Sequence, residues 1–398
     1  MILSRKGEGI SSSITLAITA RAKEMKANGI DIIGFGAGEP DFNTPENIQN
    51  AAIEAMKNGL TKYTPVSGID ELKEAIIEKF NIENGLMYSK SQIIISTGAK
   101  QALANLFLAI LNPDDEVLVP TPYWVSYPEL IKLADGIPVF VEGEKTSGYK
   151  YTIDNLKKVI TNKTKAIIIN SPNNPTGSVY TKDELIELAN FSKEHDLIII
   201  SDEIYEKLIY DEDNHISIAS LNQDAFDRTI VINGMSKSYA MTGWRIGYAA
   251  GNEKIIKIMN NIQSHMTSNP NSIAQYASLE ALKGDQTPLY NMIGEFKKRR
   301  DYVVTRIGQI NGLDLIPPKG AFYAFIDISK LIGKYIEGEK INGSLDFCEK
   351  LLIIGKVATI PGMAFGLDNY IRISYATSMD NITVGLDRLE EFINKLQV

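Results

Sequence analysis

The chain has 398 residues, of which 44% are hydrophobic and 23% charged, and its formal net charge is −8. This composition is typical of a globular protein, and the length favours two domains. Because the charge balance is acidic, we expect neither a nucleic-acid partner nor binding to an anionic membrane.

Cysteine and histidine are scarce, and this scarcity bears on compartment and metal binding. Cys348 is the only cysteine, so an intrachain disulfide is impossible and a reducing compartment is expected. The N-terminus has no signal-peptide core and no run reaches the roughly 18 apolar residues of a membrane span, so we expect a cytoplasmic protein. His195, His215 and His265 are scattered without ligand spacing, and no metal site is predicted.

The first forty residues predict a helix and a short strand. The helix runs from about Ser13 to Asn28, and the strand from Ile30 to Phe35. The cluster from Gly34 to Gly38 is not a dinucleotide fingerprint, because Glu39 stands where the third glycine is required. We interpret it as a loop in which the backbone approaches a ligand, with a plain tight turn as the alternative.

From about residue 46 the chain alternates between helical and strand patterns. Helices are expected at 46–58, 69–84 and 98–111, and apolar strands at 92–97, 116–119, 138–141, 166–170, 197–201, 229–233 and 246–250. Buried strands separated by helices are typical of a largely parallel sheet covered on both faces.

After about Lys283 the pattern changes to that of a smaller α+β unit. Helices are expected at about 289–310, 344–354 and 380–396, and strands at 321–328 and 370–374. We therefore predict a large domain over 46–285 and a small domain over 286–398, which the N-terminal segment 1–45 joins.

Polar residues follow several predicted strands. Gly98, Ala99 and Lys100 open a helix, whose free N–H groups suit a phosphate, although an ordinary helix start is equally compatible. In the proline-framed loop 171–177, Asn173 and Asn174 offer uncharged amide donors, or simply stabilise a turn.

Two further strand ends carry charge. Asp202 ends a very apolar strand, where a carboxylate is costly unless a cation or a salt bridge pairs with it. Lys237 lies in a loop between two apolar runs, and Arg245 nearby favours the neutral amine that Schiff-base chemistry needs. A surface lysine is the alternative. Together the four strand ends supply what a pyridoxal phosphate site requires.

The sequence resembles the class I pyridoxal-phosphate aminotransferases of fold type I, and is most similar to their bacterial aspartate aminotransferase branch. The resemblance covers nearly the whole chain and rests on the segments 37–42, 63–68, 122–127, 171–177, 201–205, 234–247 and 372–376. It implies an α/β fold whose large domain has a mostly parallel seven-stranded sheet between helices, with a smaller α+β domain. It also implies pyridoxal 5'-phosphate as the cofactor.

The resemblance assigns roles around the cofactor ring. Lys237 is expected to form the Schiff base and to act as the base that moves the substrate's Cα proton. Asp202 is expected to keep the pyridine nitrogen protonated. Asn174 and Tyr205 are expected at the phenolic oxygen, and Trp124 on the ring face, although a core tryptophan would otherwise be the simpler reading.

The resemblance also implies which residues surround the cofactor's phosphate group. It places Gly98, Ala99, Lys100, Ser236 and Arg245 around this group. Tyr63 is expected to reach the phosphate of the partner subunit, which implies a homodimer with shared active sites.

Amino acids and 2-oxo acids are the implied substrates. Arg372 is expected to hold the α-carboxylate in a bidentate contact, with Gly38, Asn174 and Trp124 beside it. The enteric and animal aspartate enzymes use an arginine for the distal carboxylate where this chain has Ser264. Lys100 or the segment near Thr15 is the hypothetical replacement.

The resemblance implies a ping-pong exchange between L-aspartate, or a related amino acid, and 2-oxoglutarate. Other amino donors, including aromatic amino acids, alanine and prephenate-type substrates, stay open. So does a carbon–sulfur β-lyase, which would use the same lysine and arginine. A ligand-sensing regulator would need an added DNA-binding domain; we do not expect one, because the catalytic-type pattern begins within the first forty residues and the chain is acidic.

Overall fold

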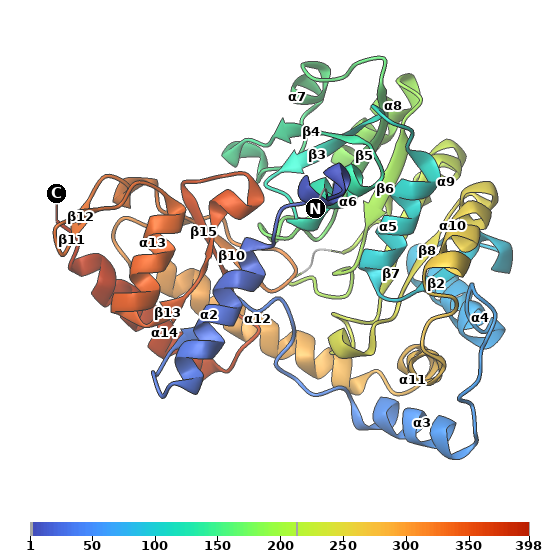
Figure 1. Cartoon of the computed structure of the whole chain (residues 1–398), viewed down its shortest axis with the longest axis horizontal. Coiled ribbons are helices and arrows are strands. Elements are labelled where there is room, and N and C mark those ends of the chain that lie inside the picture. The colour runs from blue at the N-terminus through green and yellow to red at the C-terminus, as the bar shows by residue number, and fades with distance from the viewer. Residues whose placement is uncertain (1–2, 212–213, 398) are drawn as a thin grey trace.

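The computed structural model describes residues 3–211 and 214–397. Its largest sheet has seven strands in the spatial order β2 (Ile93–Ser96), β8 (Gly247–Ala250), β7 (Thr229–Gly234), β6 (Ile198–Asp202), β5 (Thr164–Asn170), β3 (Glu116–Thr121) and β4 (Ile137–Glu142). All neighbours are parallel except β8, which runs antiparallel to β2 and β7 (Figure 1). The predicted, largely parallel sheet is confirmed.

Both faces of this sheet are buried, which explains its unbroken apolar strands. In β5, Ile168 packs into the cluster beneath α5 (Ala99–Ile110), α6 (Ser126–Leu133) and α10 (Glu253–Met266). Its neighbours Ile167 and Ile169 pack on the opposite face, beneath α7 (Ile153–Lys157), α8 (Lys182–Glu194) and α9 (Gln223–Arg228). Since successive strand side chains point to opposite faces, a run of isoleucines satisfies both.

A second sheet of four strands has the order β14 (Ile360–Pro361), β15 (Tyr370–Ser374), β10 (Tyr323–Asp327) and β9 (Asp314–Leu315). Its strands are antiparallel. The helices of this C-terminal part are α12 (Thr287–Ile307), α13 (Ser344–Lys350) and α14 (Met379–Asn394), and a hairpin is formed by β11 (Tyr335–Ile336) and β12 (Glu339–Lys340). Figure 1 shows it beside the larger sheet, with α12 running between the two parts.

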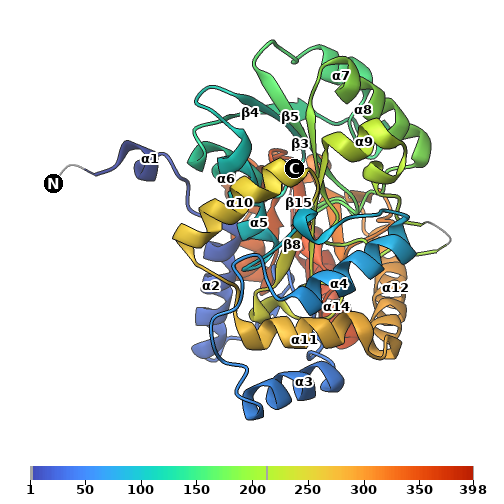
Figure 2. The same ribbon diagram turned by 90° about the vertical axis from the view of Figure 1, so that its right-hand side faces the viewer.

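The N-terminal segment lies with the C-terminal part of the chain. Its strand β1 (Ile33–Gly34) pairs in parallel with β13 (Val357–Ala358), and α2 (Ile14–Ala27) contacts β13 and β14. The predicted strand 30–35 is thus shortened to two residues. The small helix α1 (Arg5–Glu8) stands away from the body in Figure 2 and buries no residue.

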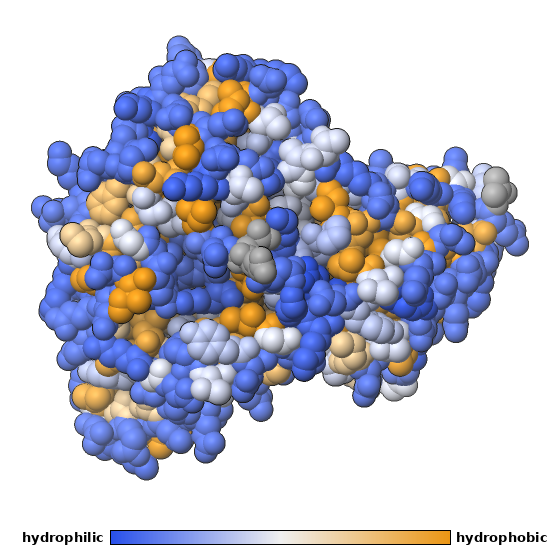
Figure 3. Space-filling model, turned by 180° about the vertical axis from the view of Figure 1, so that it is seen from behind, coloured by the Kyte–Doolittle hydropathy of each residue, from blue (hydrophilic) through white to orange (hydrophobic). Residues whose placement is uncertain are grey.

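The remaining helices are α3 (Glu46–Lys57), α4 (Asp70–Lys79) and α11 (Ser272–Lys283), and both α3 and α4 pack against α11. The predicted helices 69–84 and 344–354 end in π-helical turns at Phe80–Asn84 and Leu351–Gly355. No helix of the described residues is long and apolar enough to cross a membrane. Seen from behind, the surface is mainly hydrophilic, with hydrophobic residues in small groups (Figure 3).

Candidate active site

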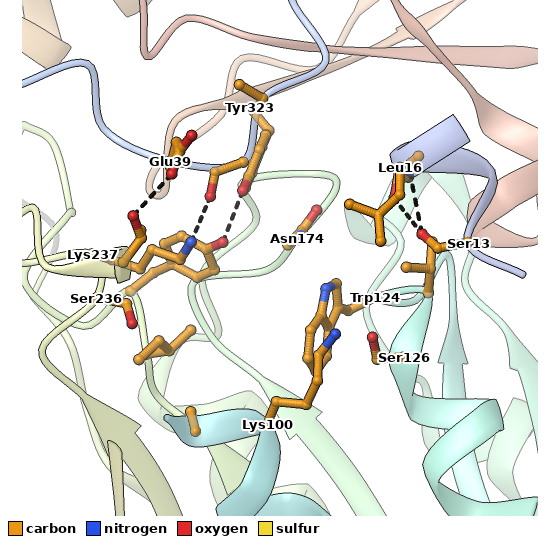
Figure 4. Close-up of a pocket in the computed structure, with 18 of the residues that line it drawn as sticks. Ser13, Leu16, Glu39, Lys100, Trp124, Ser126, Asn174, Ser236, Lys237 and Tyr323 are labelled. Atoms are coloured by element: carbon orange, nitrogen blue, oxygen red, sulfur yellow. Dashed lines mark hydrogen bonds between the residues drawn. The ribbon is translucent and has the colours of Figure 1, made fainter. Parts of the chain in front are cut away.

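A cavity of about 520 Å³ lies where the strand ends of the large sheet face α2 and β15. Twelve of the predicted site residues line it: Thr15, Gly38, Ala99, Lys100, Trp124, Asn174, Asp202, Tyr205, Ser236, Lys237, Arg245 and Arg372. Figure 4 shows several of them pointing into the same space. Two predicted residues do not line it, namely Gly98 and Tyr63.

Lys237 lies in the turn between β7 and β8, and its Nζ donates a hydrogen bond to the carbonyl of Gly38 (Figure 4). The pKa of Lys237 is lowered to about 8, chiefly by burial; the Glu39 carboxylate opposes this fall, and the cations Arg372 and Arg245 contribute to it. A substantial share of this amine is therefore neutral near pH 8, as a nucleophile or general base requires.

Beside this lysine the backbone of two sheet strands meets the start of α5. Gly234 pairs with Gly247, and a Cβ on Gly247 would lie 2.1 Å from the amide nitrogen of Ala99. The first N–H groups of α5 have no partner within the helix and carry the positive end of its dipole. A backbone contact this close leaves no room for a side chain at position 247.

Arg245 supplies the cation next to this helix start. The backbone of Arg245 is in the left-handed helical region, with φ 58° and ψ 53°. Its Nη1 donates to the carbonyl of Thr242 at 2.9 Å. A Cβ on Gly98 would lie 2.4 Å from Nη2 of Arg245. The contribution of Gly98 is therefore the space it leaves for the guanidinium. With Ser236 on the same wall, the arrangement can seat a phosphate group.

Asp202 is a buried carboxylate at the end of β6, 4% exposed. Tyr127 donates to its Oδ2 at 2.6 Å, and the N–H of Ile204 donates to Oδ1 at 3.3 Å. Burial raises the pKa of Asp202 to about 6, and the hydrogen bond from Tyr127 opposes this rise. Because no side chain of the described residues forms an ion pair with it, Asp202 is suited to a cationic group inside the cavity.

Arg372 is 4% exposed, and two of its donors are occupied. Nη1 donates to Oδ1 of Asn174 and Nη2 to the carbonyl of Gly36, each at 3.0 Å. Its guanidinium lies 4.4 Å from the ring centre of Tyr323. The buried Nε has no hydrogen-bond partner among the described residues. A buried guanidinium with a free donor and no carboxylate partner suits a carboxylate ligand.

Two aromatic groups complete the walls. The hydroxyls of Tyr205 and Tyr323 lie 2.9 Å apart (Figure 4). Burial raises the pKa of both tyrosines, so their hydroxyls stay protonated as hydrogen-bond donors. On the other side, the ammonium of Lys100 lies 5.1 Å from the centre of the Trp124 ring. Burial and the charge of Arg245 lower the pKa of Lys100.

The cavity also contains residues that the sequence did not single out as site residues. They include Glu39, Tyr127, Asn170, Tyr323, Thr19 and Lys23. Tyr127 belongs to the segment 122–127, and Glu39 adjoins Gly38, so local sequence held a signal for both. The sequence around Tyr323 held no such signal, because its place depends on how the four-stranded sheet that contains β10 lies beside Tyr205, whose hydroxyl it contacts.

Some polar residues have structural contacts instead. Asn173 lies outside the cavity lining, and its Oδ1 accepts bonds from the N–H and hydroxyl of Thr176 at 3.1 and 2.9 Å. Ser264 is half-buried on α10 outside the cavity lining, and its hydroxyl donates to the carbonyl of Asn261. Tyr63 is 92% exposed on the surface.

A second charged cluster lies buried behind Asp202. Nε2 of His215 lies 2.9 Å from Oε2 of Glu203, whose other oxygen accepts from Ser201 and Ser217. Burial would lower the pKa of His215, but Glu203 raises it above its ordinary value. Glu203, Glu206 and His215 each offer a potential metal-binding atom, and these atoms lie within 4.8 Å of one another. The spacing of these residues in the sequence did not predict this proximity. Hydrogen bonds within the protein already use both oxygens of Glu203.

Comparison with known proteins places this geometry in a family. The model of the family "Aminotransferase class I and II" matches residues 30–389. An aspartate aminotransferase of Bacillus sp. (strain YM-2) is 50% identical over 98% of this chain and 99% of its own. An aspartate/prephenate aminotransferase of Nitrosomonas europaea is 45% identical over 99% of this chain and 100% of its own.

Solved structures agree. The aspartate aminotransferase of Rhizobium meliloti superposes with a TM-score of 0.96, at 42% identity and 100% coverage of both chains. That of Thermus thermophilus with maleate gives 0.93, also at 42% identity, covering 98% of this chain and 100% of its own. The chain has the fold of these enzymes, fold type I. It belongs to the class I and II aminotransferase family.

Proposed function

We propose that this protein is a pyridoxal-phosphate-dependent aminotransferase that exchanges the amino group of L-aspartate with 2-oxoglutarate in a ping-pong cycle. The family and the names of its relatives support this function. The observation that carries it is one cavity that unites the amine of Lys237, the unpaired carboxylate of Asp202 and the free donor of Arg372.

The residues fit pyridoxal 5'-phosphate. The start of α5 at Ala99, with Ser236 and Arg245, would hold the phosphate. Asp202 would hold the protonated ring nitrogen, since the cavity otherwise leaves this buried carboxylate without a cation. Lys237 would hold the aldehyde carbon.

Around the ring, Trp124 would cover one face, and Asn174 and Tyr205 would donate to the phenolic oxygen. When bound, the cofactor supplies an electron sink for the charge left on the substrate's Cα. Lys100 would contribute mainly its backbone N–H beside the phosphate.

The chain's own groups would handle the proton and the substrate. The Nζ of Lys237, neutral above a pH of about 8, accepts the proton from the substrate's Cα. Arg372 holds the α-carboxylate, with its guanidinium already oriented by Asn174 and Gly36. Trp124 and Gly38 line the space beside it.

The distal carboxylate of the substrate would be held by Lys100 or by the N-terminal segment near Thr15. Both line the cavity, whereas Ser264 on α10 does not, and its hydroxyl donates to the carbonyl of Asn261. Replacement of Lys100 by alanine is expected to reduce kcat/KM for aspartate. An unchanged kcat/KM would exclude this role for Lys100.

We propose a homodimer with shared active sites. Tyr63 is 92% exposed and would reach the cofactor phosphate of the partner subunit. The nearby exposed apolar side chains of Ile53 and Met56 on α3, and the projecting helix α1, are compatible with a subunit contact.

We further propose a large domain over 46–285 and a small domain over 286–398 joined by 1–45. The two sheets lie within these ranges, and β1 pairs with β13 across them. A reducing compartment, the cytoplasm, is the proposed location, because one cysteine in the chain excludes an intrachain disulfide.

The amino donor is decided by a half-reaction screen. Purified protein is mixed with aspartate, glutamate, alanine, phenylalanine or arogenate, and the absorbance of the bound cofactor is followed. We expect aspartate and glutamate to react fastest. A faster reaction with arogenate, the amino partner of prephenate, would favour the specificity named for the Nitrosomonas europaea relative. Pyruvate release from cystathionine, without glutamate formation from aspartate, would instead identify a β-lyase.

The role of Lys237 is tested by reducing the protein with borohydride and mapping its peptides. The cofactor is expected on the peptide that contains Lys237, and replacement of Lys237 by alanine should remove both the adduct and the activity. An adduct on another lysine would refute the mechanism.

A further inference from the structure

One face of α2 is polar and lines the cavity. Thr15, Thr19 and Lys23 are spaced four residues apart, so they lie on the same side of the helix, and all three contact the cavity. A Cβ on Gly36 would lie 3.2 Å from Oγ1 of Thr19, and the carbonyl of Gly36 accepts the bond from Arg372. This face of α2 therefore runs past the arginine proposed to hold the α-carboxylate.

Lys23 brings an unpaired cation to this face. Over residues 3–211 and 214–397, its ammonium group forms neither an ion pair nor a hydrogen bond. Helical side chains lean toward the N-terminus of their helix, which is the direction of Thr19 and Thr15 from Lys23, and Lys23 itself lines the cavity. Leu16, near this end of α2, points toward the cavity in Figure 4, and the hydroxyl of Ser13 caps the helix by accepting from the N–H of Leu16.

The other cations of the cavity have different neighbours. The guanidinium of Arg245 lies beside Gly98, which precedes α5; Lys237 donates to the carbonyl of Gly38, and Arg372 donates to Asn174. Lys100 lies over the Trp124 ring, on the wall formed by the large sheet. Only Lys23 among the described cations of the cavity comes from the wall that α2 forms.

Aminotransfer between aspartate and 2-oxoglutarate requires one site to accept dicarboxylates of two lengths. With the α-carboxylate fixed at Arg372, the outer carboxylates of four-carbon and five-carbon substrates end one methylene apart. A charged pair gains most when its geometry is close, so two lysines on different walls serve two lengths better than one.

We propose that Lys23 is a specificity-determining residue that receives the outer carboxylate of five-carbon dicarboxylates, the class of glutamate and 2-oxoglutarate. This inference rests on the proposed function, because it needs Arg372 to hold the α-carboxylate of a dicarboxylic substrate.

The test uses two dicarboxylates that cannot exchange an amino group. The dissociation constants of succinate, with four carbons, and glutarate, with five, are measured by titration calorimetry on the cofactor-loaded protein. The variants are K23M, which keeps the length of the stem, and K26M, which removes an exposed lysine of α2 that lies outside the cavity lining. Substrate KM and kcat for 2-oxoglutarate and oxaloacetate accompany the titrations.

K23M is expected to weaken glutarate about tenfold, as for the loss of one charge-assisted hydrogen bond, and succinate less than about twofold. KM for 2-oxoglutarate should rise with little change in kcat, and K26M should leave all values unchanged. Equal weakening of both ligands, or unchanged glutarate binding, would overturn the role of Lys23 while leaving the aminotransferase proposal intact. If the unaltered protein bound neither succinate nor glutarate, both the role of Lys23 and the proposed exchange of dicarboxylic substrates would be overturned.

Discussion

The hydroxyl of Tyr127 donates a hydrogen bond of 2.6 Å to Oδ2 of Asp202 inside the protein. Both side chains are buried, so this contact is a principal stabiliser of the ionised carboxylate, whose pKa burial raises to about 6. The ability of Asp202 to hold a cation therefore depends in part on a neighbouring phenol.

Replacement of Tyr127 by phenylalanine is expected to weaken cofactor binding. A hydrogen bond to a charged group contributes about 1.5 kcal/mol or more, so the Kd of pyridoxal phosphate should rise about tenfold. Equilibrium dialysis with absorbance detection measures it. Tyr151 provides the matched control, because its buried hydroxyl donates to the carbonyl of Leu118 away from the cavity. If Tyr127→Phe and Tyr151→Phe change the Kd equally, the contact has no special role.

The protonation of Lys237 should set the pH dependence of cofactor capture. Its pKa is lowered to about 8, and the neutral amine predominates above that value. The rate at which cofactor-free protein reacts with pyridoxal phosphate should rise with pH to a plateau, with a midpoint near this pKa. Because Glu39 raises the pKa of Lys237, Glu39→Gln should move the midpoint to lower pH. Stopped-flow absorbance provides the rates.

Glu78→Gln is the control for this experiment, since Glu78 is exposed and lies outside the cavity. It should leave the midpoint in place. A midpoint that moves upward in Glu39→Gln would contradict the assigned electrostatics.

Gly98 and Gly85 form a matched pair. Both have positive φ, 81° and 67°, so alanine strains the backbone at either position. A Cβ at Gly98 would collide with Arg245, whereas no atom of the described residues lies within 4 Å of one at Gly85. Gly98→Ala should therefore weaken cofactor affinity by roughly tenfold by displacing Arg245 from the phosphate, while Gly85→Ala should lower the unfolding temperature only. Equal cofactor affinity in the two variants would refute this.

His215 should make stability depend on pH. Its folded-state pKa lies above the ordinary value of 6.5, so the protonated pair with Glu203 stabilises the fold below that pH. The stabilisation is lost as pH rises through the folded pKa. His215→Gln should therefore lower the unfolding midpoint most at pH 6, with a smaller effect at pH 9, in thermal unfolding at fixed protein concentration. The exposed His265→Gln is the control. A difference that grows with pH would contradict the prediction.

The local sequence predicted which polar residues lie together at the ends of β5, β6 and β7. The ends of β6 and β7 and the loop after β5 brought Asp202, Lys237 and Asn174 to one edge, as expected for parallel strands. The two-residue strand β1 was overestimated, because its length depends on pairing with β13, more than 300 residues away in the chain.

The parts of the cavity that come from α2 and from the four-stranded sheet were harder to predict than its floor, which the strand ends of the large sheet form. Tyr323 and Lys23 reach the cavity only because the four-stranded sheet and α2 lie beside the strand ends of the large sheet, an arrangement that leaves no local sequence signal. Asn173 and Asn174 are adjacent and chemically identical, yet only Asn174 faces Arg372. Such a choice is made by loop geometry, which residue type does not encode.

The contact between Gly247 and the amide of Ala99 divides the site into parts that tolerate change differently. A side chain added at Gly247 must push apart the Lys237 loop and the start of α5, so we expect almost no acceptable substitution at this floor of the cavity. The α2 wall is exposed and thinly packed, with Ala22 as its only buried residue in the described structure. Efforts to redirect this protein toward new amino acids should therefore vary α2 and keep the floor intact.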